Sequence, residues 1–311
     1  MEKQIELYAL TGFLGAGKTT LLQSILRDLH EKKVGVIQNE FGKLGIDGEI
    51  LKSNDNIHMV EINKGSIFCS CLQFNFLNAL VDMSTQELDC IFIESSGLAD
   101  PSNIEEILTV CKMKIGDVYE FKGVICLVDA LHFDEQIQDI ETVNRQLKHC
   151  NLAIVSKLDL LGEGGLEEIT KKIRIINPVC KIGVSDFGKM NQAFLQEDLL
   201  LYKWAESEET LNTVENKPKT LFLNYYDSID GVKFQEFLDE TKKECYRLKG
   251  FFLIDEEWKQ VDVVGNKVDY QPCEAKDHSE LVIISKIGPQ IIKSIFANWE
   301  AIFGGKPELK N

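Results

Sequence analysis

The feature that most constrains the fold is a glycine-rich segment near the start of the chain. It reads Thr11-Gly12-Phe13-Leu14-Gly15-Ala16-Gly17-Lys18-Thr19-Thr20, follows the apolar run 5–10, and precedes residues 21–26, which have helical spacing. A strand, a glycine loop and a helix in this order are the context of a phosphate-binding loop. The alternative is a glycine turn before an ordinary helix, and the agreement of the motif with both flanks disfavours it.

The residue types of this loop predict how a nucleoside triphosphate would be held. Glycines let the backbone approach an anion closely, and the helix N-terminus gives partial positive charge to the phosphates. We expect Lys18 to reach the β- and γ-phosphates and the Thr19 hydroxyl to ligate Mg²⁺. The residues predicted to bind the nucleotide here are Gly12, Gly15, Ala16, Gly17, Lys18, Thr19 and Thr20.

Up to about residue 202, short apolar runs alternate with longer amphipathic segments. This alternation predicts an α/β domain with a mostly parallel sheet and helices on both faces. The predicted strands are 5–10, 34–38, 57–62, 90–94, 123–128, 152–156 and 181–184. The predicted helices are 19–29, 74–84, 103–110, 134–148, 165–176 and 191–201. Ligands of such sheets bind beyond the carboxyl ends of the strands.

A polar, acidic stretch separates this pattern from a second one. Residues 203–218 lack a clear period and predict a linker between a P-loop domain at 1–202 and a smaller domain at 219–311. Strands clustered between two helices predict an α+β fold for the smaller domain. The predicted strands are 220–226, 245–254, 258–264, 267–271 and 281–285, and the predicted helices are 232–243 and 291–303. The Gly265-Asn266 pair between two apolar runs predicts a hairpin.

The composition limits the partners of the chain. Its 311 residues include 50 acidic and 34 basic side chains, and the net charge of −16 disfavours broad binding to nucleic acid or anionic lipid. No apolar run approaches the roughly 18 residues of a membrane span, and residues 1–4 lack the features of a signal peptide. We therefore expect a cytoplasmic protein that binds neither nucleic acid nor membranes.

A second nucleotide motif follows the run 90–94. Glu94 stands at the carboxyl end of this predicted strand, and a small-residue loop with Gly97 comes next. In phosphate-loop enzymes a carboxylate at this place holds Mg²⁺, and the glycine amide senses the γ-phosphate in a loop that moves when that phosphate is lost. We expect these roles for Glu94 and Gly97. The alternative is a strand that ends in a solvated glutamate.

A third motif lies at the end of the run 152–156. Ser156-Lys157-Leu158-Asp159 resembles the guanine-reading motif of GTPases, with Ser in place of the usual Asn. The Asp159 carboxylate can accept two hydrogen bonds from guanine N1 and N2, and a site built for such bonds rejects an analogue without the donors. Lys157 would lie along the base plane. The alternative is a helix start with capping residues.

A loop at residues 39–47, after the second predicted strand, is where a GTPase keeps its first mobile loop. Glu40 and Asp47 are candidates to bind the waters of the metal ion or to position the attacking water, although a solvated loop with ordinary acids is the alternative. Lys18, Glu94 and Glu40 are thus our candidates for catalysis by in-line attack of water on the γ-phosphate. No Gln or Arg finger stands out in the sequence, so we expect slow intrinsic turnover.

Five segments together resemble the CobW-type metallochaperone GTPases, which are relatives of the nickel-insertion GTPases of urease and hydrogenase. They are residues 12–20, 39–42, 94–101, 128–130 and 156–159. The resemblance implies a GTPase that uses GTP to gate delivery of a metal or a cobalamin-related cofactor to a client metalloenzyme or cofactor-binding protein. Because relatives of this family often dimerise, it also implies a homodimer as a state to test.

The cysteine motif of this family is degenerate in the chain. Relatives carry Gly-Cys-x-Cys-Cys after the third strand, where this chain reads Gly65-Ser66-Ile67-Phe68-Cys69-Ser70-Cys71. Thiolates suit Zn²⁺ and related metals, and a structural zinc site takes about four ligands. We interpret Cys69 and Cys71 as candidate ligands of a transition metal, Zn²⁺ or Co²⁺, with Glu40, a histidine or a dimer partner completing the set. The alternative is a small-residue loop with incidental thiols.

Three functions are compatible with these motifs. One is the metal or cofactor chaperone that the resemblance implies. Another is a regulatory or assembly GTPase without a transition-metal cargo, which Ser66 and Phe68 favour because they replace thiols. A small-molecule kinase built on the same loop is the third, and it predicts the use of ATP and an acceptor pocket.

Overall fold

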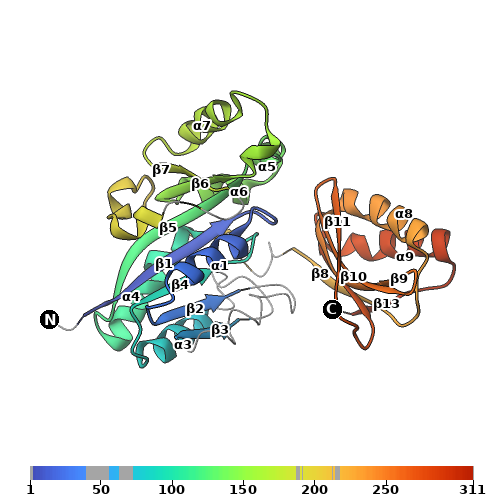
Figure 1. Cartoon of the computed structure of the whole chain (residues 1–311), viewed down its shortest axis with the longest axis horizontal. Coiled ribbons are helices and arrows are strands. Elements are labelled where there is room, and N and C mark those ends of the chain that lie inside the picture. Colours follow the sequence, from blue (N-terminus) through green and yellow to red (C-terminus); the bar gives the residue numbers. More distant parts are fainter. Residues whose placement is uncertain are drawn as a thin grey trace. The chain divides into compact units, whose positions relative to one another are not determined.

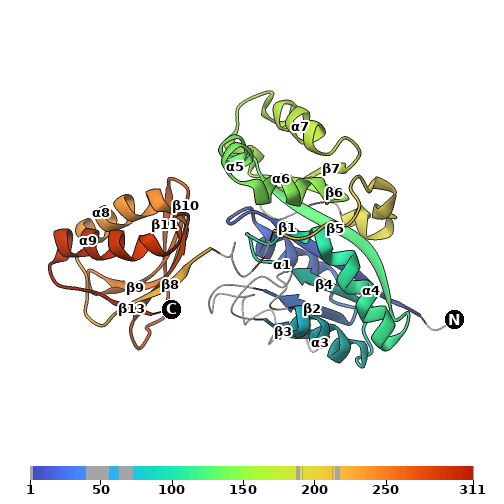
Figure 2. The same cartoon turned by 180° about the vertical axis from the view of Figure 1, so that it is seen from behind.

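The computed structural model of the chain divides into two units, Met1–Asn216 and Lys217–Asn311. It describes residues 3–39, 56–62, 73–186, 190, 192–211, 213 and 218–310. Each unit has its own sheet (Figures 1 and 2). Among the described helices, none has both the length and the apolar character needed to cross a membrane.

The first unit is built on a parallel sheet whose seven described strands have the order β3-β2-β4-β1-β5-β6-β7. The strand that leads into the glycine loop, β1, is therefore in the centre of the sheet. The strands are β1 (Ile5–Gly12), β2 (Val34–Gln38), β3 (Ile57–Glu61), β4 (Cys90–Glu94), β5 (Tyr119–Asp129), β6 (Leu152–Ser156) and β7 (Lys181–Val184). The α/β fold predicted from the alternating pattern is confirmed.

Helices lie on both faces of this sheet, with α1 on one face and α4 and α6 on the other (Figures 1 and 2). The α-helices are α1 (Lys18–Asp28), α3 (Gln73–Ser84), α4 (Ile104–Ile115), α5 (Phe133–Asp139), α6 (Glu141–Lys148) and α7 (Gly165–Ile176). The 3-10 turns are η1 (Pro101–Asn103), η2 (Leu158–Leu160), η3 (Gln192–Gln196) and η4 (Leu199–Tyr202). Under α1, the rings of Tyr8 and Phe92 stack with centroids 5.1 Å apart. Buried apolar faces on both sides of the sheet thus hold its central strands in place.

Two predicted helices are wrong in detail. The segment 134–148 forms α5 and α6 in place of one helix, because Ile140 between them has extended backbone (φ −127°, ψ 99°). The segment 191–201 forms the short turns η3 and η4 in place of an α-helix. Phe194 and Leu199 of these turns are buried in the core of the sheet, so tertiary packing sets their conformation.

The second unit is an antiparallel sheet whose six described strands have the order β11-β10-β9-β12-β8-β13, with α8 and α9 on one face (Figure 1). Its elements are β8 (Thr220–Tyr225), α8 (Gly231–Thr241), η5 (Lys242–Glu244), β9 (Cys245–Ile254), β10 (Glu257–Val264), β11 (Lys267–Pro272), β12 (Ser279–Ser285), η6 (Gly288–Gln290), α9 (Ile291–Phe303) and β13 (Glu308–Lys310). Val264 pairs with Lys267, so Gly265 and Asn266 form the predicted hairpin turn. Strand β13 was not predicted, because three residues at the end of the chain carry no periodic pattern.

Part of the stretch that was predicted as a linker lies against the first unit. We call residues 203–211 the exit segment, because the second unit follows them in sequence. The Leu211 N–H donates to Asp100 Oδ2 (2.7 Å), and the Ser207 hydroxyl donates to the Ser102 carbonyl (2.9 Å). Lys203 forms an ion pair with Glu105 of α4 at 2.8 Å. The chain is therefore held on the first unit as far as residue 211.

Candidate nucleotide site

The glycine loop leaves the end of β1 and leads directly into α1. Gly12 has φ +130°, and a Cβ added there would collide with the Leu127 carbonyl oxygen of the neighbouring strand. Gly15 and Gly17 also have positive φ values, of 77° and 98°. These left-handed backbone conformations favour glycine, so the loop depends on its glycines for its shape.

Lys18 is buried, and the loop itself holds its ammonium group. Its Nζ donates to the Gly12 carbonyl at 2.7 Å and to the Phe13 carbonyl at 3.0 Å. Gly17 is the N-cap of α1, and no described side chain caps this helix end. The N–H groups of the first turn of α1 thus lie beside a lysine ammonium, which is an arrangement suited to phosphate oxygens.

Glu94 connects the end of β4 with the start of α1. Its Oε1 accepts a hydrogen bond from the Thr19 hydroxyl at 2.5 Å, and its Oε2 accepts one from Gln38 Nε2 at 2.7 Å. The carboxylate is buried. A hydroxyl and a carboxylate side by side are the hard oxygen ligands that Mg²⁺ takes from phosphate-loop proteins, so these residues fit the metal that the motifs imply.

The loop after β4 packs against the glycine loop. A Cβ added to Gly97 would lie 2.6 Å from the Leu14 amide nitrogen, so the two backbones approach as closely as glycine allows. Behind the loop, Gln146 of α6 donates through Nε2 to the Gly97 carbonyl at 3.2 Å and to the Ala99 carbonyl at 2.9 Å. The structure therefore places Gly97 directly against the glycine loop.

The predicted guanine-reading motif is anchored to the same loop. The Ser156 hydroxyl lies within hydrogen-bonding distance of the Ala16 carbonyl (2.9 Å) and of the Val128 carbonyl (3.1 Å), and it donates to one of them at a time. This contact ties the end of β6 to the phosphate loop. A serine in place of the usual asparagine thus still braces the loop.

Lys157 and Asp159 follow at the end of β6. Lys157 has left-handed backbone (φ 60°), and its Nζ donates to Asp129 Oδ2 at 2.6 Å. The Asp129 carboxylate is fully buried and also accepts hydrogen bonds from the Leu131 N–H (3.1 Å) and from His132 Nδ1 (3.0 Å). Asp159 is exposed in η2. A buried carboxylate thus fixes the lysine, while Asp159, the predicted reader of the base, stays accessible.

Four predicted site residues lie outside the part of the chain that the structure describes: Glu40, Asp47, Cys69 and Cys71. Within the described part, no three or more His, Cys, Asp or Glu side chains gather as a metal-binding group. The site residues that the sequence missed are Gln38, Asp129, Arg145 and Gln146. Two of these had a signal in the sequence: Gln38 ends the predicted strand 34–38, and Asp129 directly follows the predicted strand 123–128, within the segment 128–130 of the family resemblance.

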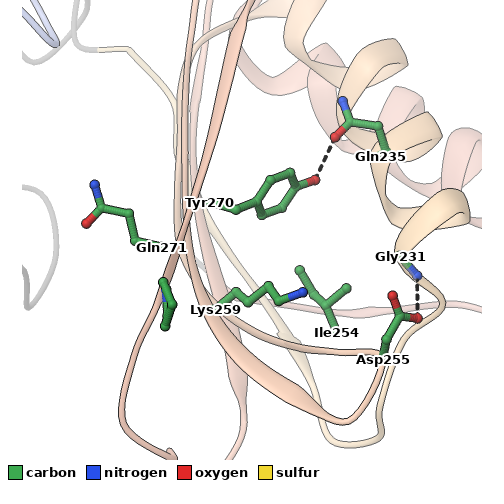
Figure 3. Close-up of a pocket in the computed structure, with 8 residues that line it drawn as sticks. Gly231, Gln235, Ile254, Asp255, Lys259, Tyr270 and Gln271 are labelled. Atoms are coloured by element: carbon green, nitrogen blue, oxygen red, sulfur yellow. Dashed lines mark hydrogen bonds between the residues drawn. The ribbon is translucent and has the colours of Figure 1, made fainter.

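The second unit contains a cavity of about 350 Å³ between the start of α8 and strands β10 and β11 (Figure 3). Tyr270 donates its hydroxyl to Gln235 at 2.7 Å, and burial raises the pKa of Tyr270 to about 12. The Gly231 N–H donates to Asp255 at 2.9 Å. None of the residues that line this cavity belongs to a predicted nucleotide motif.

A central parallel sheet, a glycine loop that holds a buried lysine, and a carboxylate at the end of the neighbouring strand define a P-loop nucleotide-binding protein. Residues 6–183 match the model of the CobW/HypB/UreG nucleotide-binding domain, and residues 220–299 match that of the cobalamin synthesis protein cobW C-terminal domain. The chain belongs to the CobW/HypB/UreG family of P-loop GTPases, as its motifs predicted.

Relatives and solved structures agree with this placement. "Zinc chaperone YjiA" of Escherichia coli (strain K12) is 29% identical over 320 residues, which cover 93% of this chain and 96% of that protein. "Zinc-regulated GTPase metalloprotein activator 1" of Schizosaccharomyces pombe is 29% identical over 190 residues, which cover 58% of this chain and 46% of that protein. The crystal structure of Zn(II)-bound YjiA GTPase from E. coli is similar in fold, with a TM-score of 0.50 and 24% identity over 96% of this chain and 99% of that one.

Proposed function

We propose that the chain is a Mg²⁺-dependent GTPase of the cytoplasm that gates delivery of Zn²⁺ to a client metalloprotein. The observation that carries the GTPase half is the contact between the Thr19 hydroxyl and Glu94 Oε1 at 2.5 Å, beside the buried Lys18. This pair lies where a P-loop enzyme holds its metal. The guanine preference rests on Lys157 and Asp159 at the end of β6.

In this proposal the loop residues act on the γ-phosphate. The Lys18 ammonium exchanges the Gly12 and Phe13 carbonyls for phosphate oxygens and stabilises the charge that develops as water attacks. Thr19 and Glu94 would hold Mg²⁺, which would supply further positive charge to the phosphates. Gly97 offers its N–H to the γ-phosphate from the loop that packs on Leu14. Glu40 is our candidate to position the water, and turnover by these groups alone is slow.

The zinc half of the proposal rests on the family and on two thiols. The relatives named above carry the words zinc chaperone and zinc-regulated GTPase in their names. Cys69 and Cys71 are soft ligands that suit this metal. The remaining ligands would come from Glu40, a histidine or a second copy of the chain in a homodimer.

Zinc titration of the purified full chain tests the proposed zinc binding. We expect stoichiometric Zn²⁺ binding, measured against a chromophoric chelator in the presence of GDP and of a non-hydrolysable GTP analogue. Because loss of an outer-shell partner alone costs about 10–100-fold in metal affinity, the double variant Cys69→Ser/Cys71→Ser should bind Zn²⁺ at least about tenfold more weakly.

Cys273→Ser is the matched control, because Cys273 is a partly exposed thiol in the second unit. It should leave zinc affinity unchanged. If the wild-type chain binds no stoichiometric Zn²⁺ or Co²⁺ in either nucleotide state, the zinc half is wrong. The remaining function is then a regulatory or assembly GTPase whose cargo is a protein.

A further inference from the structure

We call residues 95–100, which follow β4, the γ-phosphate loop. Gln146 of α6 contacts this loop, and the adjacent Arg145 contacts both the end of the loop and the exit segment. Gln146 is fully buried and faces two carbonyl oxygens, those of Gly97 and Ala99. Only the amide nitrogen can donate to two carbonyls, so the contacts fix the orientation of the side chain. Gln146 therefore holds the turn that contains the Gly97 amide.

Two buried polar atoms in and beside this loop lack a hydrogen-bond partner among the described residues. They are Gln146 Oε1 and the Ser96 hydroxyl oxygen. Buried polar atoms without partners cost free energy. A second arrangement of residues 95–99 that gave these two atoms partners would remove this cost.

Arg145 connects the end of this loop with the exit segment. Its Nε donates to Asp100 Oδ2 at 2.9 Å, and its Nη2 donates to the Ser102 hydroxyl at 3.1 Å and to the Glu209 carbonyl. The same Asp100 oxygen accepts the Leu211 N–H at 2.7 Å. The buried Asp100 carboxylate thus joins the γ-phosphate loop, α6 and the exit segment.

A second set of contacts holds the exit segment on the end of α6. Glu208 Oε1 lies 2.7 Å from Lys148 Nζ and 2.6 Å from His149 Nε2. Hydrogen bonds from Lys148 and His149 lower the pKa of Glu208 to about 2, so this carboxylate is charged at neutral pH. Burial lowers the pKa of His149, which therefore donates as a neutral imidazole at that pH.

We propose that Gln146 and Arg145 are positioning residues that couple the γ-phosphate loop to the exit segment. A γ-phosphate that engages Gly97 shifts the carbonyls that Gln146 holds, and the shift reaches residues 207–211 through Asp100 and Arg145. The exit segment continues in sequence into the second unit. This inference rests on the proposed GTP binding and deepens it, because it names the route by which the nucleotide acts.

Trp204 allows a direct test, since it is the tryptophan of the exit segment and its side chain is 51% exposed. Because the chain has 3 tryptophans, the fluorescence of Trp204 is obtained as the difference between the emission of the wild type and that of Trp204→Phe. We expect a non-hydrolysable GTP analogue, and not GDP, to change this Trp204 fluorescence. In Gln146→Leu and Arg145→Lys, the change should be lost while the analogue still binds with a Kd within about threefold of wild type.

Steady-state kinetics provide a second measurement, because kcat would not change if the two residues had only a structural role. Because misplacement of a catalytic group costs up to about 100-fold, we expect kcat for GTP to fall about tenfold in both variants with little change in KM. Gln138→Leu, the same change on the exposed side of α5, should behave as wild type. Arg145→Lys keeps a positive charge beside the buried Asp100 carboxylate, so we expect it to fold. It is therefore the variant to use if Gln146→Leu does not fold.

The outcomes separate this inference from the proposed function. A Trp204 change that persists in both variants, or that is missing from a wild-type chain that binds the analogue, overturns the coupling and leaves the GTPase intact. A wild-type chain that binds no fluorescent GTP analogue overturns the proposed function itself, and the coupling with it.

Discussion

Replacement of Lys18 by alanine is expected to reduce kcat/KM for GTP hydrolysis by about 100-fold to 1,000-fold, the usual cost of removing one donor that stabilises transition-state charge. Lys18 is buried, and its ammonium donates to the Gly12 and Phe13 carbonyls, within the loop that we propose surrounds the phosphates. Within residues 12–20, Lys18 is the only lysine or arginine. Phosphate release at several GTP concentrations, with Mg²⁺ present, measures the effect.

Lys33→Ala is the matched control for this prediction. Lys33 is an exposed lysine that pairs with Glu87 at 2.8 Å, away from every predicted motif. Its removal should change kcat/KM by less than about twofold, because surface ion pairs contribute little. Hydrolysis by Lys18→Ala at a rate close to that of the control would contradict the mechanism proposed for the loop.

Replacement of Asp159 by asparagine is expected to change the base that the site accepts. Asp159 is exposed at the end of β6, beside Lys157, whose ammonium is fixed by the buried Asp129. An asparagine loses the pair of acceptors for guanine N1 and N2. GTP should therefore bind about 100-fold more weakly, within the range of a bidentate base contact.

Xanthosine triphosphate provides the complementary half of this experiment. Xanthine has a carbonyl where guanine has its 2-amino group, so the asparagine amide can donate to it. The variant should bind xanthosine triphosphate more tightly than GTP, as measured by competition against a fluorescent guanine nucleotide. Glu163→Gln, an exposed acid after η2, should leave the preference unchanged. An unchanged preference in Asp159→Asn would show that another residue reads the base.

The sequence predicted those parts of the fold whose signal is local. Strands β2, β4 and β6 have the predicted bounds, because a strand buried in a parallel sheet is a continuous apolar run. The edge strand β7 also has the predicted bounds, although it is only half-buried. The break between α5 and α6 could not be predicted, since the amphipathic pattern continues through Ile140 although its backbone is extended. The turns η3 and η4 depend on contacts of Phe194 and Leu199 with the distant core.

The site residues also differ in whether the sequence around them carries a local signal. Gly12, Lys18 and Glu94 belong to motifs whose spacing along the chain is diagnostic. Gln146 and Arg145 are polar residues in an eight-residue helix, and nothing in their neighbourhood along the sequence distinguishes them. Their contacts with Gly97, Asp100 and Glu209 arise only when α6 packs on the sheet beside residues more than 40 positions away. The exit segment was predicted as linker for the same reason, since its acidic residues find basic partners only in the folded unit.

Titration of the wild-type full chain with GTP and with ATP, both with Mg²⁺, is the most direct test of the proposed guanine-nucleotide site. We expect GTP to bind at a single site, to be hydrolysed slowly, and to bind at least about 100-fold more tightly than ATP, since adenine lacks the N1–H and 2-amino donors that Asp159 accepts. ATP that binds as tightly as GTP or more tightly would contradict the guanine site and favour a small-molecule kinase built on the same loop.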